Sequence, residues 1–544
     1  MKNSYNISFA IVLGGDLVKS PEHLGVAYLT AVLREAGYTV SIIELRDIRD
    51  IDKLLKHIEK NQVDMLGFST TCINIGHITA LSKQVKEAYP AITLACGGHG
   101  VTFKDIEALS EIPSIDIVIR GEAEETIVEL VQKLEKKLTL KDVRGVTFRD
   151  VDTGEIVRNE ERPLLDDLDK LPFPSRDQFE QHNGRISYMR LCSSRGCYGN
   201  CAYCSAYIGR KQEGPRWRGR SPKNVVDEIE FLVKKYDFHT FDFVDSTFED
   251  PPNPKGKERA GQIAQEIIDR GLEIFYNCCF RAENWSESDH DLLDTLVESG
   301  LEKINIGFEA GNNKLLKLLC KRATVEDNYR ALSVIKQHPE IYITFGYLFY
   351  HPYVDFNDLR DNARFLYNTG IGQVTRHYLW PLEIYPSTTI KDRLIKDGLL
   401  KEGGVVYDIY SYDFVYPEVG MLAKHMVKYL KHDIIWDYEI FDIVLHTYIT
   451  RLLRKFKQNK EAADLVNEFW TFVNQKRSEL AAYNYEFITT WIDTAEGGWT
   501  DTLLSKAESL DICKIITENK AMIQDKQLRL SRTLHSMGIR LTGR

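Results

Sequence analysis

Two long stretches of this chain alternate short apolar runs with amphipathic segments, and this alternation restricts the possible fold more than any other feature. In residues 1–140 it predicts strands at Ile7–Leu13, Thr39–Leu45, Met65–Ser69, Ile92–Cys96 and Ile115–Ile119. Helical patterns lie between these runs and after the last one. Such alternation is typical of α/β domains with a doubly wound parallel sheet. Rossmann-like sheets of this kind bind ligands in a crevice beyond the carboxyl ends of the strands.

The alternation returns in residues 184–400. Strands are predicted at 186–192, 239–245, 273–280, 302–308, 342–349 and 373–384, with helices beginning near Pro222, Gly256, Ser286, Thr324, Asp355 and Thr388. Six successive strand–helix units predict a partial (β/α)6 barrel. In such barrels the reacting groups lie at the carboxyl ends of the strands.

The two remaining segments have other patterns. Residues 141–183 predict a connector in which Gly145–Arg149 and Glu155–Arg158 form a hairpin, followed by LDDLDKLPFPSRD. The two prolines of that stretch disfavour a helix or a central strand. Residues 401–544 have helical periodicity from about residue 405, are rich in aromatic side chains, and predict a mostly α-helical domain that Gly497-Gly498 interrupts.

Three cysteines are crowded into the stretch RLCSSRGCYGNCAYCSAY. Cys197, Cys201 and Cys204 have C-x3-C-x2-C spacing and follow the first predicted barrel strand. Thiolates on so short a loop can converge on one metal centre. One alternative is a structural zinc site with Cys192 as the fourth ligand, and another is a thioredoxin-like pair of Cys201 and Cys204. Three thiolates on a four-iron cluster would instead leave one iron open to a ligand.

At this point the sequence resembles the radical S-adenosylmethionine (SAM) superfamily. Cys197, Cys201 and Cys204 match its [4Fe–4S] motif, and Tyr203 is the aromatic residue expected before the third cysteine. The resemblance implies that SAM binds the open iron and that its reductive cleavage gives a 5′-deoxyadenosyl radical. It also implies a SAM-binding role for residues at the later strand ends, namely Asp245, Thr247, Arg281 and Glu309.

The first 140 residues resemble the cobalamin-binding domain of B12-dependent radical SAM enzymes. The matching stretches are HLGVAYLTAVLREAGY, VDMLGFSTT, LACGGHGVTF and IDIVIRGEAEET. The resemblance implies that cobalamin contacts Leu24, Gly25, Ser69, Thr70, Thr71, Gly97, Gly98, Gly121 and Glu122. Glycines let a bulky ligand approach the backbone, and hydroxyls can bond its amides. The Asp-x-His-x-x-Gly motif that places histidine on cobalt in other B12 domains is absent, and Asp16 and His23 do not match it.

The combined resemblance implies a cobalamin-dependent enzyme that methylates an unactivated carbon of a small-molecule or peptide natural product, or catalyses a related radical rearrangement or cyclisation. A flavodoxin or ferredoxin would supply electrons. One alternative is a B12-independent radical SAM enzyme with a degenerate first domain. Another is a metal-binding or sensor protein without turnover.

The composition narrows the other possibilities. The formal net charge is −10 and the basic clusters are short, which disfavours a nucleic-acid partner. No apolar run reaches the length of about 18 residues that a membrane-spanning helix needs. MKNSYNISFAIVLGG is interpreted as a first strand and not as a signal peptide. These features predict a cytoplasmic protein without a membrane partner.

Overall fold

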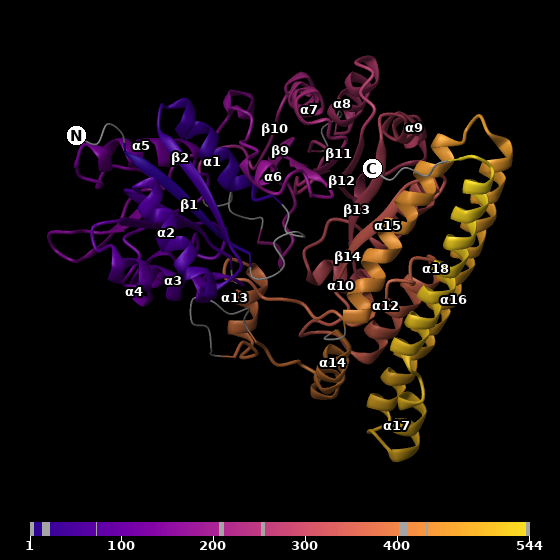
Figure 1. The fold of residues 1–544 in the computed structure, drawn as a ribbon. Helices are drawn as coiled ribbons and strands as arrows, with labels where there is room; N and C mark the ends of the chain where they lie inside the picture. The colour runs from indigo at the N-terminus through magenta and orange to yellow at the C-terminus, as the bar shows by residue number, and fades with distance from the viewer. Residues whose placement is uncertain are drawn as a thin grey trace.

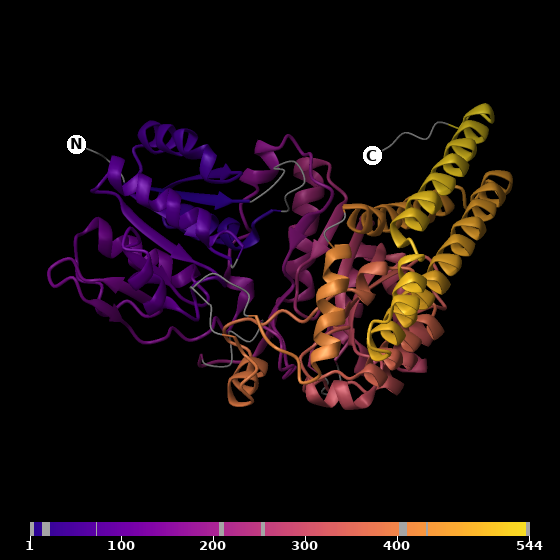
Figure 2. The ribbon, with the colours of Figure 1, turned by 90° about the horizontal axis from the view of Figure 1, so that it is seen from below.

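A computed structural model describes residues 5–13, 22–71, 73–205, 212–251, 256–401, 411–430 and 433–539. Asp16 therefore lies outside the described residues. Figures 1 and 2 show one α/β unit at one end of the molecule, a second α/β unit beside it, and the long helices α16 and α18 on the opposite side. Within the described residues no helix is both long enough and apolar enough to cross a membrane.

The first unit is a seven-stranded sheet with the order β2-β1-β3-β4-β5-β6-β7. Its elements are β1 (Asn6–Val12), α1 (Leu24–Glu35), β2 (Thr39–Leu45), α2 (Ile51–Asn61), β3 (Met65–Ser69), α3 (Ile75–Ala88), β4 (Thr93–Gly97), α4 (Asp105–Glu111), β5 (Ile117–Ile119) and α5 (Glu124–Glu135). The first five strands pair in parallel. Strand side chains alternate between the two faces, so α2, α3 and α4 cover one apolar core and α1 and α5 cover the other. The doubly wound sheet is confirmed.

The predicted hairpin of the connector is also present. It consists of β6 (Val146–Arg149) and β7 (Ile156–Arg158), and β6 pairs antiparallel with β5. The hairpin therefore extends the first sheet.

The second unit is a parallel five-stranded sheet with the order β14-β13-β12-β11-β8. The strands are β8 (Met189–Leu191), β11 (Thr240–Phe243), β12 (Phe275–Arg281), β13 (Leu301–Glu309) and β14 (Tyr342–Tyr347). The helices between and after them are α7 (Pro222–Tyr236), α8 (Glu258–Asp269), α9 (His290–Glu298), α10 (Asn313–Leu318), α11 (Val325–Ile335) and α12 (Phe356–Asn368). Thr324 and Asp355 form capping boxes at the N-termini of α11 and α12, which explains why these starts could be predicted from sequence.

The sixth strand predicted at 373–384 does not form. This segment contains the 3-10 helix Thr375–Tyr378, and only an isolated parallel bridge from Tyr350 to Pro381 continues the sheet. Pro381 has no N–H to donate to a strand neighbour. Helix α15 (Asp433–Lys455) packs beside β14 instead, where Tyr342 donates a hydrogen bond of 2.8 Å to Asp442.

The C-terminal region is helical, as predicted. It comprises α14 (Pro417–Leu430), α15, α16 (Lys460–Glu496), α17 (Asp501–Glu508) and α18 (Ile512–Ser536), and it follows α13 (Thr389–Lys396). The second half of α16 buries Phe487 and Trp491 in the core of the second unit. The first half packs with α15 and α18 around a separate core that includes Val466 and Phe469.

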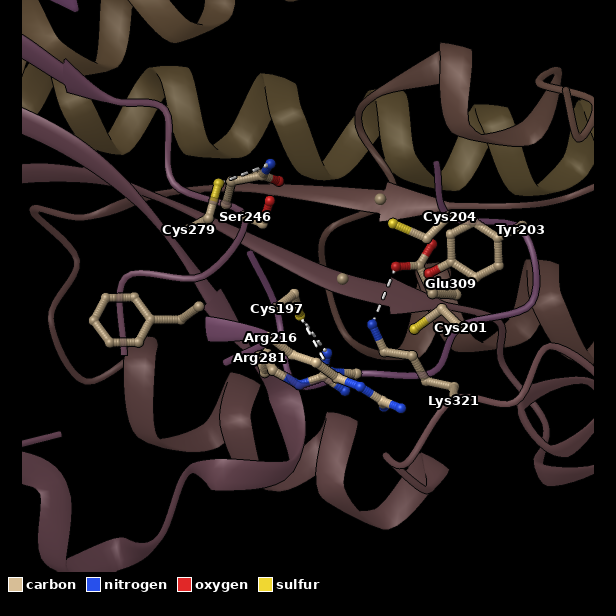
Figure 3. A pocket seen from close by; sticks show the side chains of 15 residues that line it. Cys197, Cys201, Tyr203, Cys204, Arg216, Ser246, Cys279, Arg281, Glu309 and Lys321 are labelled. Atoms are coloured by element: carbon tan, nitrogen blue, oxygen red, sulfur yellow. Dashed lines mark hydrogen bonds and ion pairs between the residues drawn. The ribbon is translucent and has the colours of Figure 1, made fainter. Parts of the chain in front are cut away.

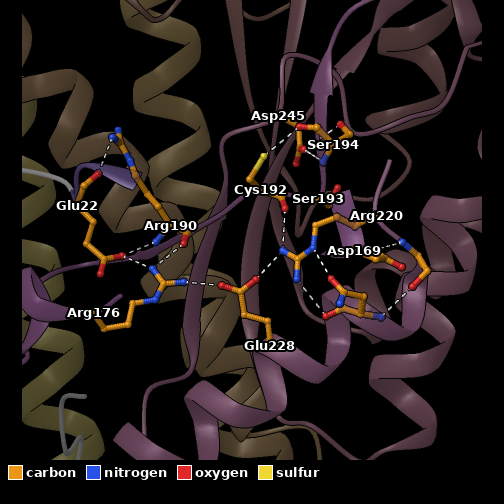
Figure 4. Close-up of polar contacts among 12 residues, drawn as sticks. Glu22, Asp169, Arg176, Arg190, Cys192, Ser193, Ser194, Arg220, Glu228 and Asp245 are labelled. Carbon is orange, nitrogen blue, oxygen red and sulfur yellow. Dashed lines mark hydrogen bonds and ion pairs between the residues drawn. The ribbon is translucent and has the colours of Figure 1, made fainter. Parts of the chain in front are cut away.

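A chain of buried ion pairs joins the two α/β units (Figure 4). Arg176, in the connector, lies 2.8 Å from Glu22 before α1 and 2.8 Å from Glu228 on α7. Glu228 also lies 2.5 Å from Arg220. All four side chains are at most 4% exposed. Each buried charge is stabilised by its oppositely charged neighbour, because an unpaired ion in the interior is strongly disfavoured. The network therefore fixes the first sheet against the second.

Candidate functional site

The three clustered cysteines lie in the loop after β9 (Ser194–Gly196), a short strand that pairs antiparallel with β10 (Trp217–Gly219). Two backbone hydrogen bonds hold the middle of this loop. Ala202 donates to the carbonyl of Leu319 at 2.8 Å, and its own carbonyl accepts from Ile390 at 3.0 Å. As a result, all three cysteines line one cavity of about 250 Å³ at the carboxyl ends of the second sheet (Figure 3).

The surroundings of Cys197 suit a thiolate ligand. Its Sγ accepts hydrogen bonds from the Gly199 N–H at 3.3 Å and from Arg281 Nη1 at 3.4 Å. Positive charge and N–H donors near sulfur favour the deprotonated form that binds metals. Burial opposes the charge of Arg281, but Glu283 and the neighbouring cysteines outweigh it and raise the pKa of Arg281.

Cys192 lies apart from the three clustered cysteines. It is the first residue after β8, it donates to the Ser194 carbonyl, and it packs in a small apolar group with Leu24 and Tyr28 of the first unit. It does not line the cavity, so the fourth-ligand arrangement for zinc is not present. Among the described residues, no three His, Cys, Asp or Glu side chains gather closely enough to hold one metal ion. Three thiols spaced around a cavity fit a multi-iron cluster, which is larger than an ion.

Two opposite charges lie on the same cavity, and both side chains are at least nine-tenths buried. Glu309 ends β13, as predicted, and lies 3.2 Å from Lys321. The backbone of Glu309 has a φ of +65°, which is uncommon for a residue other than glycine. A Cβ at Gly307 would lie 2.6 Å from Lys321 Nζ, so a side chain there would displace the Lys321 ammonium group. A carboxylate beside an ammonium group suits a zwitterionic ligand such as the methionyl part of SAM.

Tyr203 and Arg281, for which contact with SAM stays a prediction, also line the cavity. Burial raises the pKa of Tyr203 well above its usual value, and the nearby charge of Glu309 raises it further. Tyr203 therefore stays neutral and can act only through its ring and hydroxyl.

Asp245 and Thr247 follow the end of β11 but lie outside the cavity lining. Both are buried and neither lines the cavity, whereas Ser246 between them does. Asp245 accepts hydrogen bonds from the backbone and the hydroxyl of Ser194. Burial raises the pKa of Asp245 to about 6. In this structure the two residues support the start of β9, and their contact with SAM stays a prediction.

Other lining residues were not found from sequence, namely Arg216, Cys279, Asn305 and Lys321. Cys279 and Asn305 point inward because of the alternation along β12 and β13, a signal that the sequence carries once the strand register is known. Lys321 follows α10 and not a strand, so no strand-end rule could have identified it.

At the carboxyl edge of the first sheet, four of the predicted cobalamin residues gather. Thr70 donates through both its backbone N–H and its hydroxyl to the Gly97 carbonyl, at 2.8 and 2.7 Å. Gly98 has a φ of +102°, and a Cβ there would lie 2.6 Å from the Thr70 carbonyl oxygen. Ser69 Oγ lies 2.7 Å from His23 Nε2. These contacts hold the ends of β3 and β4 close together, and a side chain at Gly98 would push the Thr70 backbone away.

The remaining predicted cobalamin residues have other surroundings. Thr71 and Gly25 are exposed, whereas Leu24 is buried against Cys192. Gly121 lies directly against the side chain of Gln212 in the second unit. Glu122 pairs with Arg218 at 2.8 Å and with Arg195 at 3.6 Å. Leu24, Gly121 and Glu122 therefore join the two units, and any contact of theirs with cobalamin stays a prediction.

Comparison with protein families gives two matches that follow one another along the chain. The B12 binding domain model matches residues 10–131, and the Radical SAM superfamily model matches residues 191–366. Their limits agree with the two α/β units.

Two curated relatives each match more than half of this chain. An uncharacterized methyltransferase from Pyrococcus horikoshii is 29% identical, over 58% of this chain and 66% of its own length. The anaerobic magnesium-protoporphyrin IX monomethyl ester cyclase of Rubrivivax gelatinosus is 29% identical, over 58% of this chain and 56% of its own. The chain thus spans between half and two thirds of the length of these relatives.

A solved structure extends the likeness to the C-terminal helices. The cobalamin-dependent SAM radical enzyme OxsB, with aqua-cobalamin and SAM bound, has a TM-score of 0.67. It is 18% identical and covers 96% of this chain and 84% of its own, which shows a shared fold. Together with the two family matches, these comparisons show that the chain belongs to the cobalamin-dependent radical SAM enzymes, whose cofactors are a [4Fe–4S] cluster, SAM and cobalamin.

Proposed function

We propose that this enzyme modifies an unactivated carbon of a small-molecule or peptide substrate, by methyl transfer or by a radical rearrangement or cyclisation. The observation that carries this proposal is that the carboxyl edge of the first sheet lies against the β9–β10 ribbon that leads into the cysteine loop. Glu124, after β5, lies 2.5 Å from Arg195 on β9, and Glu122 lies 2.8 Å from Arg218 on β10. The carboxyl edge of the first sheet and the cysteine-lined cavity therefore lie on either side of the same contact between the two units.

The residues of the second unit would act by binding and orientation. Cys197, Cys201 and Cys204 would hold the cluster, with Arg281 stabilising the Cys197 thiolate. Glu309 and Lys321 would orient the amino and carboxylate groups of SAM. When bound, SAM on the reduced cluster supplies a carbon radical, and cobalamin supplies a metal centre that can carry a methyl group. A cytoplasmic ferredoxin or flavodoxin is the proposed electron donor.

Methyl transfer and cyclisation each have support among the names of the relatives. One relative is named a methyltransferase and another a cyclase. The two outcomes differ in stoichiometry, because methyl transfer uses a second SAM as the methyl source and yields S-adenosylhomocysteine in addition to 5′-deoxyadenosine.

The first experiment is anaerobic reconstitution with iron, sulfide and hydroxocobalamin, followed by desalting, metal analysis and a UV–visible spectrum. We expect about four irons and one retained corrin per chain. The loaded enzyme is then incubated with trideuteromethyl-SAM, a low-potential reductant and fractionated metabolite extract. A product carrying the labelled methyl supports methyl transfer. An unlabelled product formed with 5′-deoxyadenosine alone supports rearrangement or cyclisation. Protein that takes up neither iron nor corrin contradicts the proposal.

A further inference from the structure

The cysteine-lined cavity contains a fourth thiol that the proposed cluster does not use. Cys279, on β12, lines the cavity together with Cys197, Cys201 and Cys204. In Figure 3, Cys279 and Ser246 lie at one side of the cavity, and Cys201 and Cys204 lie at the other. This thiol comes from a different element than the cysteine loop and faces the space that SAM and substrate would share.

The register of β12 explains why this cysteine faces inward. Asn277, Cys279 and Arg281 alternate with Cys278, which is 2% exposed and belongs to the apolar core behind the sheet. Asn305 of the adjacent strand donates to Cys279 Sγ at 3.6 Å, which orients the sulfur.

The same strand face carries a second polar side chain, Asn277. Asn277 is 2% exposed, and its Oδ1 has no hydrogen-bond partner within the described part of the chain. A buried carbonyl oxygen without a partner is destabilising, and native proteins rarely retain one. Asn277 lies one pleat deeper than Cys279 on the same face, beyond the residues that line the cavity, and its Nδ2 donates to Asp242 at 3.4 Å.

The thiol is held in its protonated form. Burial raises the pKa of Cys279 to about 11, so at neutral pH the sulfur keeps its hydrogen. A neutral thiol is a poor metal ligand and a poor nucleophile. Its remaining reactivity is homolytic, because an S–H bond is weaker than most C–H bonds.

We propose that Cys279 donates a hydrogen atom to carbon radicals formed in this cavity. In this step the S–H bond breaks homolytically and a C–H bond forms, which leaves a thiyl radical on Cys279. One electron from a ferredoxin- or flavodoxin-class donor and one proton from solvent then restore the thiol. The inference rests on the proposed function. It favours outcomes that end on a carbon radical needing a hydrogen, such as rearrangement or cyclisation.

The test needs only SAM and no identified substrate. The reconstituted full-length enzyme is exchanged into D2O and reduced with titanium(III) citrate in the absence of added thiols. Deuterium in the 5′-deoxyadenosine formed is then measured by mass spectrometry. Because the Cys279 S–H exchanges with solvent and carbon-bound hydrogens do not, we expect deuterium in the wild-type product. In Cys279→Ser the deuterium per 5′-deoxyadenosine should fall at least tenfold. The matched control is Cys320→Ser, which removes an exposed thiol next to Lys321 and should retain wild-type enrichment.

A second measurement tests the position of the thiol in the wild-type enzyme, independently of any variant's folding. Anaerobic maleimide labelling followed by peptide mass spectrometry should modify Cys279 more slowly than the exposed Cys320, and S-adenosylhomocysteine should protect Cys279 only. Undiminished deuterium in Cys279→Ser, or labelling of Cys279 that the SAM analogue does not affect, would overturn the inference and leave the proposed function intact. Failure of the wild-type enzyme to cleave SAM would contradict the proposed function and this inference with it.

Discussion

The two α/β units of this enzyme build their carboxyl edges in different ways. The second unit uses side chains, since buried charges such as Glu309 and Lys321 converge with three thiols on a cavity of about 250 Å³. The first unit uses mainly backbone, since Gly98 approaches the Thr70 carbonyl so closely that a Cβ would lie 2.6 Å away. The second site depends on the charge and protonation of its side chains, whereas the edge of the first sheet depends on close backbone packing at Gly98. Single substitutions should therefore have different signatures in the two units.

The largest effect, a loss of bound iron, is expected on substitution of a cysteine that would hold the cluster. Cys201→Ala removes one of three cluster ligands, so the reconstituted protein should lose nearly all of its iron and its broad visible absorbance. The matched control is Cys192→Ala, because Cys192 is buried in the contact between the units and does not line the cavity. Iron analysis and UV–visible spectra check both variants. Loss of iron in the Cys192 variant with retention in the Cys201 variant would overturn the ligand assignment.

The next effect concerns the contact that holds the two edges together. Glu228→Gln removes the negative charge between Arg176 and Arg220, which are both at most 4% exposed. Removing one member of a buried ion network typically costs about 3–5 kcal/mol, because the remaining charges stay buried and unpaired. Urea unfolding of the apo protein measures this loss.

A surface pair provides the control for that variant. Arg34 and Asp177 also bridge elements, but the Arg34 side chain is 42% exposed. Arg34→Gln should change the free energy of unfolding by less than about 1 kcal/mol. Equal losses in the two variants would show that burial does not determine the strength of this contact.

Sequence patterns predicted the sheets of both units because period-2 and period-3.6 apolar repeats are local properties. They did not predict the loss of the sixth strand, which depends on α15 packing beside β14. They also did not predict Lys321, which reaches the cavity through the turn after α10. Glu122 shows the same limit, because its partners Arg195 and Arg218 lie far away in sequence. The sequence therefore did not predict the tertiary contacts, that is, which strand end or loop packs against which other segment.

A smaller effect tests the buried charge beneath the cavity of the second unit. Burial raises the pKa of Asp245 from 3.8 to about 6, so the folded state binds the proton more tightly than the unfolded state. The stabilisation is fully present below about pH 4 and is lost as the pH rises through about 6. Two pKa units correspond to about 3 kcal/mol. Asp245→Asn lacks this titration, so its stability relative to wild type should rise by up to this amount between pH 4 and pH 7. Parallel urea unfolding curves at both pH values check the result, and a pH-independent difference would contradict it.

The smallest effect, a weaker binding of cobalamin, is expected at the contact between Gly98 and Thr70 in the first unit. Gly98→Ala forces a side chain onto a φ of +102° and against the Thr70 carbonyl. Strain of this kind costs about 1–3 kcal/mol of folding stability unless the Thr70 end of β3 shifts to relieve it. Such a shift would distort the edge that is proposed to hold the corrin, so we expect hydroxocobalamin binding to weaken by about tenfold, or about 1.4 kcal/mol, while the iron content stays at the wild-type level. Gly76→Ala is the control, since a Cβ there meets nothing within 4 Å. Absorbance titration with hydroxocobalamin measures the affinity. Unchanged corrin binding in Gly98→Ala would indicate that the corrin binds elsewhere. Loss of iron in the same variant would show that a change at the edge of the first sheet also disturbs the cysteine-lined cavity.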